Sequence, residues 1–305
     1  MQISKPQKMN EILLIFSLIL FSFSHCSCPG SVMFVFGIPE GENVIRWHLH
    51  CGDFRASATI LNQKLRYLDR EIHLSFTDFL FDSVYLDTTY ANPKYSFPPQ
   101  EKVITACVEG CSRLIHGHYD PAGQKRLVPL KWLIAVGSYL IGKERIILAL
   151  AETFDLLIYA DARKRSILRL LEWTELEDRL TDDPLATPLH FVSMSLLGKQ
   201  KLSVYRDSFK GRFSHVLGIK PTGWTFDDKA AAISPVNEWN LAMPKIEGTS
   251  GIWPVPYSEH SSYKELQEFL RKISVHRVIP TVDNYGDVIL DIRRAGGNTD
   301  SLLWQ

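Results

Sequence analysis

The chain of 305 residues lacks an excess of charge of either sign, because 34 lysines and arginines balance 34 aspartates and glutamates. A protein that binds nucleic acid over a broad surface usually carries a basic excess. Any nucleic-acid contact must therefore come from a local patch. The sequence also has no internal repeat and no low-complexity segment, which excludes a repeat architecture.

Cysteine is scarce and irregularly placed. The five cysteines are an odd number without a regular framework, which argues against a secreted domain built on disulfides. Cys26-x-Cys28 and Cys107-x₃-Cys111 have spacings that metal sites use, but a zinc site usually needs a second pair at suitable spacing. Buried free thiols are the simpler interpretation.

Long apolar runs are almost absent. The candidate run, Ile12 to Phe23, follows Lys5 and Lys8 and is short for a membrane span. Its charged-then-apolar layout is that of a secretory signal peptide, and a buried segment is the alternative interpretation.

What remains is ordinary globular material with 45% hydrophobic residues, enough for one large domain or two smaller ones. Strand-like apolar runs alternate with amphipathic stretches, which predicts an α/β fold with a mixed or parallel sheet. The predicted strands are 32–38, 44–50, 83–86, 132–136, 155–159, 190–194 and 215–219, the first two forming a hairpin. The predicted helices are about 98–114, 142–154, 162–173 and 262–272, and 235–251 is a predicted loop.

One histidine, His260, lies at the joint between an apolar strand-like stretch and the last predicted helix. Ser262 and Glu265 form the capping-box pattern that starts this helix. A lone histidine is usually structural or exposed. Its place at a strand–helix joint, where a side chain is held at an open edge, favours a metal-binding or catalytic role.

Two carboxylates also follow strands. Asp53 comes just after 44–50, and Asp87 comes directly after 83–86. Carboxylates at such edges suit divalent metals and can bridge two of them, although each alone is more often a turn or cap residue. The turn Pro221–Trp224 exposes backbone N–H groups that can hold a phosphate, and an ordinary tight turn is the alternative.

Two short histidine patterns are weaker metal candidates. His116-x-His118-x-Asp120 ends at Pro121, where a full motif has another histidine, and a solvated loop explains it equally well. His48-x-His50-x-x-Asp53 places both imidazoles on one face of a strand. Short patterns of this kind arise by chance.

Seven motifs, taken together and in order, resemble the signatures of the DNA cross-link repair nucleases of the β-CASP metallo-β-lactamase group. The resemblance covers about residues 28 to 282. The motifs are CPGSVM (28–33), LHCGDFR (49–55), YLDTTY (85–90), GSYLIGKE (137–144), PTGW (221–224), YSEHSS (257–262) and IPTV (279–282).

The resemblance implies a partial metallo-β-lactamase αββα sandwich with an inserted β-CASP domain. Residues 28–90 and 251–282 would form the metallo-β-lactamase part, and 91–250 would form the insert. Residues 1–27 would be a segment foreign to the family, and 283–305 would be a divergent tail.

The resemblance also implies metal-dependent hydrolysis of DNA phosphodiesters, as a 5′-3′ exonuclease or a structure-selective endonuclease. This chemistry would serve the repair of interstrand cross-links or double-strand breaks in the nucleus, with DNA and other repair proteins as partners. One or two divalent ions, usually zinc, would activate water. Asp53, Asp87 and His260 would be catalytic, with Asp53 and His260 as metal ligands. The substrate-binding residues would be Ser138, Thr222, Gly223 and Ser258.

Two departures from the family change this expectation. The family's principal motif, His-x-His-x-Asp-His, should precede Cys28, and residues 1–27 contain none. A family histidine directly before Cys-Pro-Gly is replaced by Ser27. Since a catalytic zinc typically uses three protein ligands and a water, we expect this chain to be an N-terminally truncated product that binds zinc poorly and is inactive alone.

Three alternatives remain open. The first is a non-catalytic remnant that binds DNA or a partner. The second is an RNA-processing β-CASP nuclease, although Val282, where that branch tends to have histidine, favours DNA. The third is a secreted metallo-hydrolase, in which the apolar N-terminus directs the chain to the secretory pathway. No membrane contact is expected unless that run is a true signal.

Overall fold

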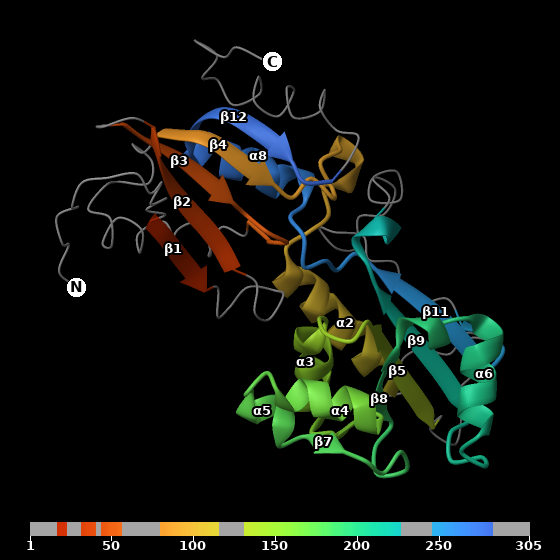
Figure 1. Cartoon of the computed structure of the whole chain (residues 1–305). Coiled ribbons are helices and arrows are strands. Elements are labelled where there is room, and N and C mark those ends of the chain that lie inside the picture. The colour runs from red at the N-terminus through yellow and green to blue at the C-terminus, as the bar shows by residue number, and fades with distance from the viewer. Residues whose placement is uncertain are drawn as a thin grey trace.

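The structure is a computed structural model that describes residues 17–22, 32–40, 44–56, 80–115, 131–226 and 246–282. Within these residues the strands form two sheets, one of five strands and one of seven (Figure 1). The combination of these sheets with helices confirms the predicted α/β class.

The first sheet has the strand order β1-β2-β3-β4-β12. Its first three strands are antiparallel neighbours, whereas β3, β4 and β12 run parallel, and the β2–β3 pair confirms the predicted hairpin. The edge strand β1 comes from the apolar run 12–23. The bounds are β1 Ser17–Ser22, β2 Val32–Glu40, β3 Val44–His50, β4 Leu80–Leu86 and β12 Ser274–Pro280.

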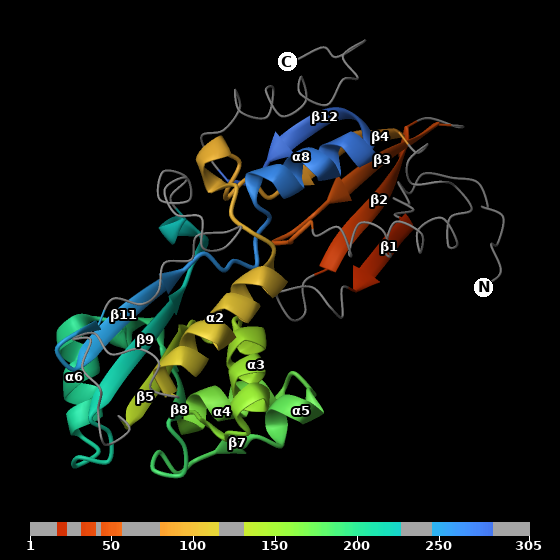
Figure 2. The same ribbon diagram turned by 180° about the vertical axis from the view of Figure 1, so that it is seen from behind.

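Helix α8 (Tyr263–Lys272) covers one face of this sheet (Figure 2). Its Leu266 and Phe269 are fully buried against strand residues such as Val35 and Val84, so strand and helix share one apolar core. The described residues thus hold one sheet and one helix layer of the expected αββα sandwich.

The second sheet has the order β10-β11-β9-β5-β8-β6-β7 and is parallel except for the β10–β11 pair. Parallel strands need crossover connections, and the alternation of strands and helices along the chain provides them. The bounds are β5 Trp132–Ser138, β6 Ile158–Tyr159, β7 Leu180–Thr181, β8 Leu189–Ser193, β9 His215–Pro221, β10 Ile246–Glu247 and β11 Ser250–Val255.

Helices cover both faces of the second sheet. Trp132, Ile134 and Val136 of β5 join a core with α2 and α3, while the alternate residues Leu133 and Ala135 pack on the side of α6. This period of two is what a strand buried on both faces requires. The helices are α2 Gln100–Ile115, α3 Glu144–Phe154, α4 Ala162–Arg169, α5 Thr174–Glu177 and α6 Lys199–Asp207, with short 3₁₀ turns η1 Pro93–Tyr95, η2 Met194–Leu196 and η3 Gly223–Thr225.

Some predicted bounds were wrong. The strand predicted from Asp155 begins at Ile158, because Asp155 ends α3 in a left-handed conformation with φ of 48°. The predicted helix 162–173 stops at Arg169, and the predicted loop 235–251 contains β10 and the start of β11. No helix among the described residues is both long and apolar enough to cross a membrane.

The chain changes sheets between β11 and α8. Strand β11 pairs with β9 in the second sheet over Ser250–Val255, so the return to the first sheet follows Val255 rather than residue 251. The carboxyl ends of β9 and β11 point toward the first sheet (Figure 1). The residues that connect the two sheets therefore converge in one region.

Candidate metal centre

Three acidic or imidazole side chains meet at the edge of the first sheet. Asp53 follows β3 and Asp87 follows β4, and these two strands are parallel neighbours, so both residues leave the sheet at the same edge. His260 approaches from the connection between β11 and α8. One potential ligand atom from each residue lies within 4.8 Å of the others, and this is the metal-compatible group found among the described residues.

Asp87 and His260 are directly joined. Nδ1 of His260 lies 2.7 Å from Oδ2 of Asp87, which is buried with 1% of its side chain exposed. The other oxygen of Asp87 accepts hydrogen bonds from the hydroxyl and backbone N–H of Thr89, at 2.6 and 3.1 Å. Asp87 thus orients the imidazole through Nδ1 and leaves Nε2 of His260 available to a ligand.

Asp87 and His260 each stabilise the charged form of the other. Burial opposes the charged form of each group, but the bond from His260 and those from Thr89 hold the pKa of Asp87 below its usual value. Burial likewise disfavours the imidazolium, yet the bond to Asp87 and the charge of Asp53 raise the pKa of His260. The carboxylate is therefore ionised and the imidazole carries its Nδ1 proton.

The backbone around His260 is fixed to the segment that carries Asp53. The N–H of His260 donates to the hydroxyl of Ser258 at 2.9 Å. The Ser261 hydroxyl donates to the carbonyl of Phe54 and accepts from the N–H of Ala56, at 2.9 and 3.0 Å. The two bonds of Ser261 join residues more than 200 positions apart in the sequence.

Arg55 strengthens the same junction, and this role was missed in the sequence. Its fully buried guanidinium pairs with Glu265 at 3.0 Å and donates to the carbonyls of Ser258 and Pro98, each at 2.9 Å. A buried charge with fixed acceptors requires a unique arrangement of its neighbours. The only available signal was an arginine inside the LHCGDFR motif.

Three of the four predicted substrate-side residues surround Tyr90. The Tyr90 hydroxyl is hydrogen-bonded to the side chains of Ser258 and Thr222, while burial raises its pKa to about 12. A Cβ on Gly223 would lie 2.7 Å from the Tyr90 ring, so this turn packs directly on the tyrosine. Tyr90 itself was not predicted as a site residue, although it ends the YLDTTY motif.

Ser138 has different contacts. It is buried at the end of β5, where its hydroxyl donates to the Tyr139 carbonyl at 2.8 Å and accepts from Lys164. Its position at the carboxyl end of a central strand of the second sheet remains compatible with a substrate-side role, but its hydroxyl bonds lie outside the Tyr90 group.

The weaker histidine candidates lie elsewhere. Nδ1 of His48 is 2.6 Å from the Ser83 hydroxyl. His50 accepts from the N–H of Gly52 at 3.1 Å and stacks on Tyr85. Neither joins Asp53 in the metal-compatible group of the described residues. His116, His118 and Asp120 lie outside the described residues.

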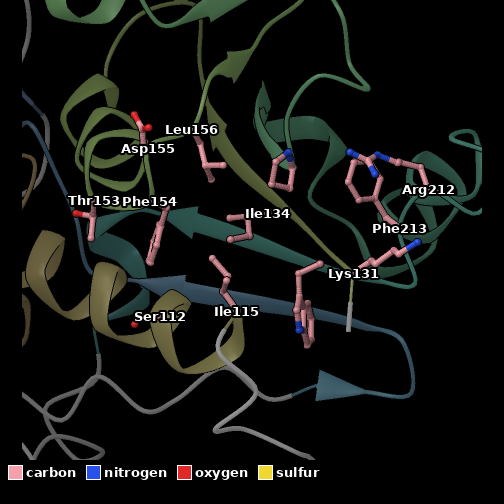
Figure 3. A pocket seen from close by; sticks show the side chains of 12 residues that line it. Ser112, Ile115, Lys131, Ile134, Thr153, Phe154, Asp155, Leu156, Arg212 and Phe213 are labelled. Atoms are coloured by element: carbon pink, nitrogen blue, oxygen red, sulfur yellow. The ribbon is translucent and has the colours of Figure 1, made fainter. Parts of the chain in front are cut away.

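A cavity in the second sheet's half of the structure is separate from this centre. It encloses about 640 Å³ and is lined by apolar residues such as Ile115, Ile134, Phe154 and Phe213 (Figure 3). Lys131 and Trp132, at the amino end of β5, also line it. The cavity therefore lies at the opposite end of the strands from the candidate metal centre.

The comparisons with known proteins agree with the motif pattern. A family model described as "DNA repair metallo-beta-lactamase" matches residues 174–286, which include Thr222, Gly223, Ser258 and His260. The chain is 34% identical over 296 residues to the DNA cross-link repair protein pso2/snm1 of Schizosaccharomyces pombe, covering 92% of this chain and 49% of that protein. It is 36% identical over 257 residues to the DNA cross-link repair protein SNM1 of Arabidopsis thaliana, covering 84% and 47%.

A more distant relative is the 5′ exonuclease Apollo of Danio rerio, with 25% identity over 257 residues that cover 84% of this chain and 35% of that protein. The chain spans about half the length of the first two curated relatives it matches.

Proposed function

The chain belongs to the DNA repair metallo-β-lactamase family, whose members include DNA cross-link repair nucleases of the β-CASP type, and from this premise we propose that it acts on DNA in cross-link or double-strand break repair. The chemistry proposed is metal-dependent hydrolysis of phosphodiester bonds, as a 5′-3′ exonuclease or a structure-selective endonuclease. The nucleus is the corresponding location, with DNA and other repair proteins as partners.

The observation that carries this proposal is the convergence of Asp53, Asp87 and His260 at one sheet edge. Carboxylate and imidazole groups are suitable ligands for a divalent ion such as zinc. Asp53 and Nε2 of His260 would hold the ion, and Asp87 would orient the imidazole as a hydrogen-bonded carboxylate. A bound divalent ion would supply an activated water and polarise a phosphoryl oxygen.

Residues of the chain would also position the DNA. Thr222, Gly223 and Ser258 lie around Tyr90, whose ring contacts that of His260 with centroids 6.1 Å apart. Hydroxyl groups close to a metal centre can bind the phosphate oxygens next to the bond that is cleaved.

The described ligand set is small for a catalytic zinc site, which typically uses three protein ligands and a water. Asp53 and His260 supply two, and both oxygens of Asp87 already accept hydrogen bonds. We therefore expect this chain by itself to bind zinc weakly and to cleave DNA slowly or not at all.

The same observation favours a second candidate function. The described metal ligands are few, whereas the second sheet is well packed. A chain of this kind would serve as a non-catalytic module that binds DNA or a repair protein. In that case DNA binding would be independent of the metal and of Asp53.

Two kinds of experiment test these proposals. Calorimetry measures metal binding, and binding and cleavage assays use 5′-phosphorylated single-stranded and duplex oligonucleotides. Asp53→Ala and His260→Ala should abolish the weak zinc binding, and Asp87→Asn should weaken it roughly 10- to 100-fold. The control is Asp155→Asn, a highly exposed carboxylate distant from the centre.

Zinc binding that is unaffected by Asp53→Ala and His260→Ala would contradict the proposed site. Tight stoichiometric zinc with robust cleavage would contradict the expectation of an inactive chain. DNA binding that persists unchanged in EDTA and in Asp53→Ala would favour the non-catalytic module.

A further inference from the structure

A large aromatic side chain is exposed beside the candidate metal centre. Trp224 has 55% of its surface accessible, although its ring packs on two others: the centroids lie 4.7 Å from Tyr90 and 5.1 Å from Tyr95. Single exposed aromatic residues are common on protein surfaces. This one is unusual because one side of the ring is held by tight contacts while much of the rest faces solvent.

The backbone holds Trp224 in place. Thr222 caps the short turn η3 by accepting from the Trp224 N–H at 3.4 Å, and its own N–H donates to the Val255 carbonyl at 2.9 Å. Gly223 lies so close to Tyr90 and Phe97 that a Cβ would be 2.7 and 3.0 Å from those rings. The turn therefore packs tightly on the aromatic cluster of Tyr90, Tyr95 and Phe97, and this packing restricts the movement of the indole.

The cluster connects Trp224 with the metal centre. Tyr90 contacts Trp224 on one side and His260 on the other, at centroid distances of 4.7 and 6.1 Å. A single strand advances about 3.4 Å per stacked nucleotide, so a base within about two or three nucleotides of a phosphate at His260 would reach the indole. A cation lies nearby, because the Lys94 ammonium is 4.7 Å from the Tyr95 centroid.

We propose that the exposed indole of Trp224 is a stacking platform for an unpaired base of the DNA strand whose phosphate lies at the metal centre. This inference rests on the proposed function. The platform combines what a nucleotide requires: a fixed π-face for the base and a neighbouring ammonium for the backbone phosphate. It makes the chain prefer a frayed or single-stranded end over a blunt duplex end.

The experiment measures binding of short 5′-phosphorylated oligonucleotides with phosphorothioate linkages, so that cleavage does not interfere. 2-Aminopurine at the first, second or third position reports stacking through quenching of its fluorescence, and anisotropy gives the dissociation constant. Trp224→Leu keeps apolar bulk against Tyr90 but removes the π-face. It should weaken single-strand binding roughly 5- to 100-fold and abolish the quenching at one position. Trp224→Phe should retain most of both.

Two controls separate stacking from other effects. Leu170→Ala removes a more exposed apolar side chain distant from the centre and should change neither signal. Zinc titration of Trp224→Leu should match the wild type, because Trp224 is not a metal ligand. Blunt duplex affinity should change much less than single-strand affinity.

Equal single-strand affinity and equal quenching in Trp224→Leu and wild type would overturn the platform and leave the proposed nuclease site intact. If the wild-type chain bound no DNA of any form, both the platform and the proposed function would fail. If Trp224→Phe lost as much affinity as Trp224→Leu, the indole would act through packing rather than stacking, which also contradicts the inference.

Discussion

Arg55 connects the two halves of the candidate site through a single side chain. It contacts Glu265 at the start of α8, the carbonyl of Ser258 beside His260, and the carbonyl of Pro98 ahead of α2. Its guanidinium also lies 5.3 Å from the Phe97 centroid. Since Asp53 is two residues away in sequence, the position of Asp53 relative to His260 depends on this arginine.

Replacing Arg55 by Met should destabilise the fold strongly. The substitution removes the ion-pair partner of Glu265 and one donor to each of the carbonyls of Ser258 and Pro98, and breaking a buried ion pair costs about 3–5 kcal/mol. Urea denaturation followed by circular dichroism measures the change. Arg46→Met is the matched control, because Arg46 pairs with Glu40 and Asp82 at an exposed position, where ion pairs contribute little to stability. Equal shifts in the two variants would show that Arg55 is not a structural connector.

At this scale the sequence indicated candidate metal-site residues that the structure brings together, but it did not indicate the residues that hold them in place. Asp53, Asp87 and His260 each follow a strand-like stretch, and strand ends are where a sheet places accessible ligands. Arg55 lies in the same motif as Asp53, yet nothing local indicates that it contacts Glu265, which is 210 positions away.

Helix α8 sets the position of His260 at the level of elements. Ser262 accepts from the Glu265 N–H at 3.4 Å, and the Glu265 carboxylate accepts from the Ser262 N–H at 2.7 Å, which confirms the predicted capping box. The helix then buries Leu266 and Phe269 against the first sheet. Because His260 immediately precedes this cap, the start of the helix is also the end of the ligand-bearing connection.

Ser262→Ala should lower the stability of the chain by about 1 kcal/mol, since it removes the hydroxyl that satisfies the Glu265 N–H. Thermal denaturation measures the loss. Ser262→Asp, which can accept the same hydrogen bond, should restore most of the stability. If the Asp variant were as unstable as the Ala variant, the cap would not be the source of the effect.

The limits of prediction at this scale come from non-local pairing. The period of apolar residues located most strands, but β11 has an apolar character compatible with either sheet. Its partner β9 is set by packing that a single sequence does not display. The left-handed Asp155 likewise ends α3 where an apolar run suggested a strand, because the backbone turn precedes Ile158.

For the molecule as a whole, each of the two sheets contributes different residues to the candidate site. The first sheet supplies Asp53 and Asp87, and the second sheet brings Thr222 and Gly223 to the same region at the end of β9. Neither sheet alone contains the candidate site. The stability of the second sheet is therefore a condition for the proposed substrate positioning. One buried histidine of this sheet should make that stability dependent on pH.

His190 lies fully buried in β8. Its Nε2–H donates to the carbonyls of Pro184 and Thr187 at 3.0 and 3.1 Å, and its Nδ1 accepts from the Tyr205 hydroxyl at 2.9 Å. Burial lowers the pKa of His190 from 6.5 to about 4, against the opposing effect of the carbonyl bonds. The neutral imidazole satisfies all three partners, and protonation would remove the acceptor that Tyr205 needs.

The folded chain should therefore lose stability as the pH falls from about 6.5 to about 4. In this window the unfolded chain binds a proton at His190 and the native chain does not, and the difference corresponds to about 3 kcal/mol. Below about pH 4 both states are protonated, so this contribution stops changing. Urea midpoints between pH 7 and 5 measure the slope, which should be shallower in His190→Gln whatever its absolute stability. An unchanged slope in His190→Gln would show that another group controls the acid sensitivity.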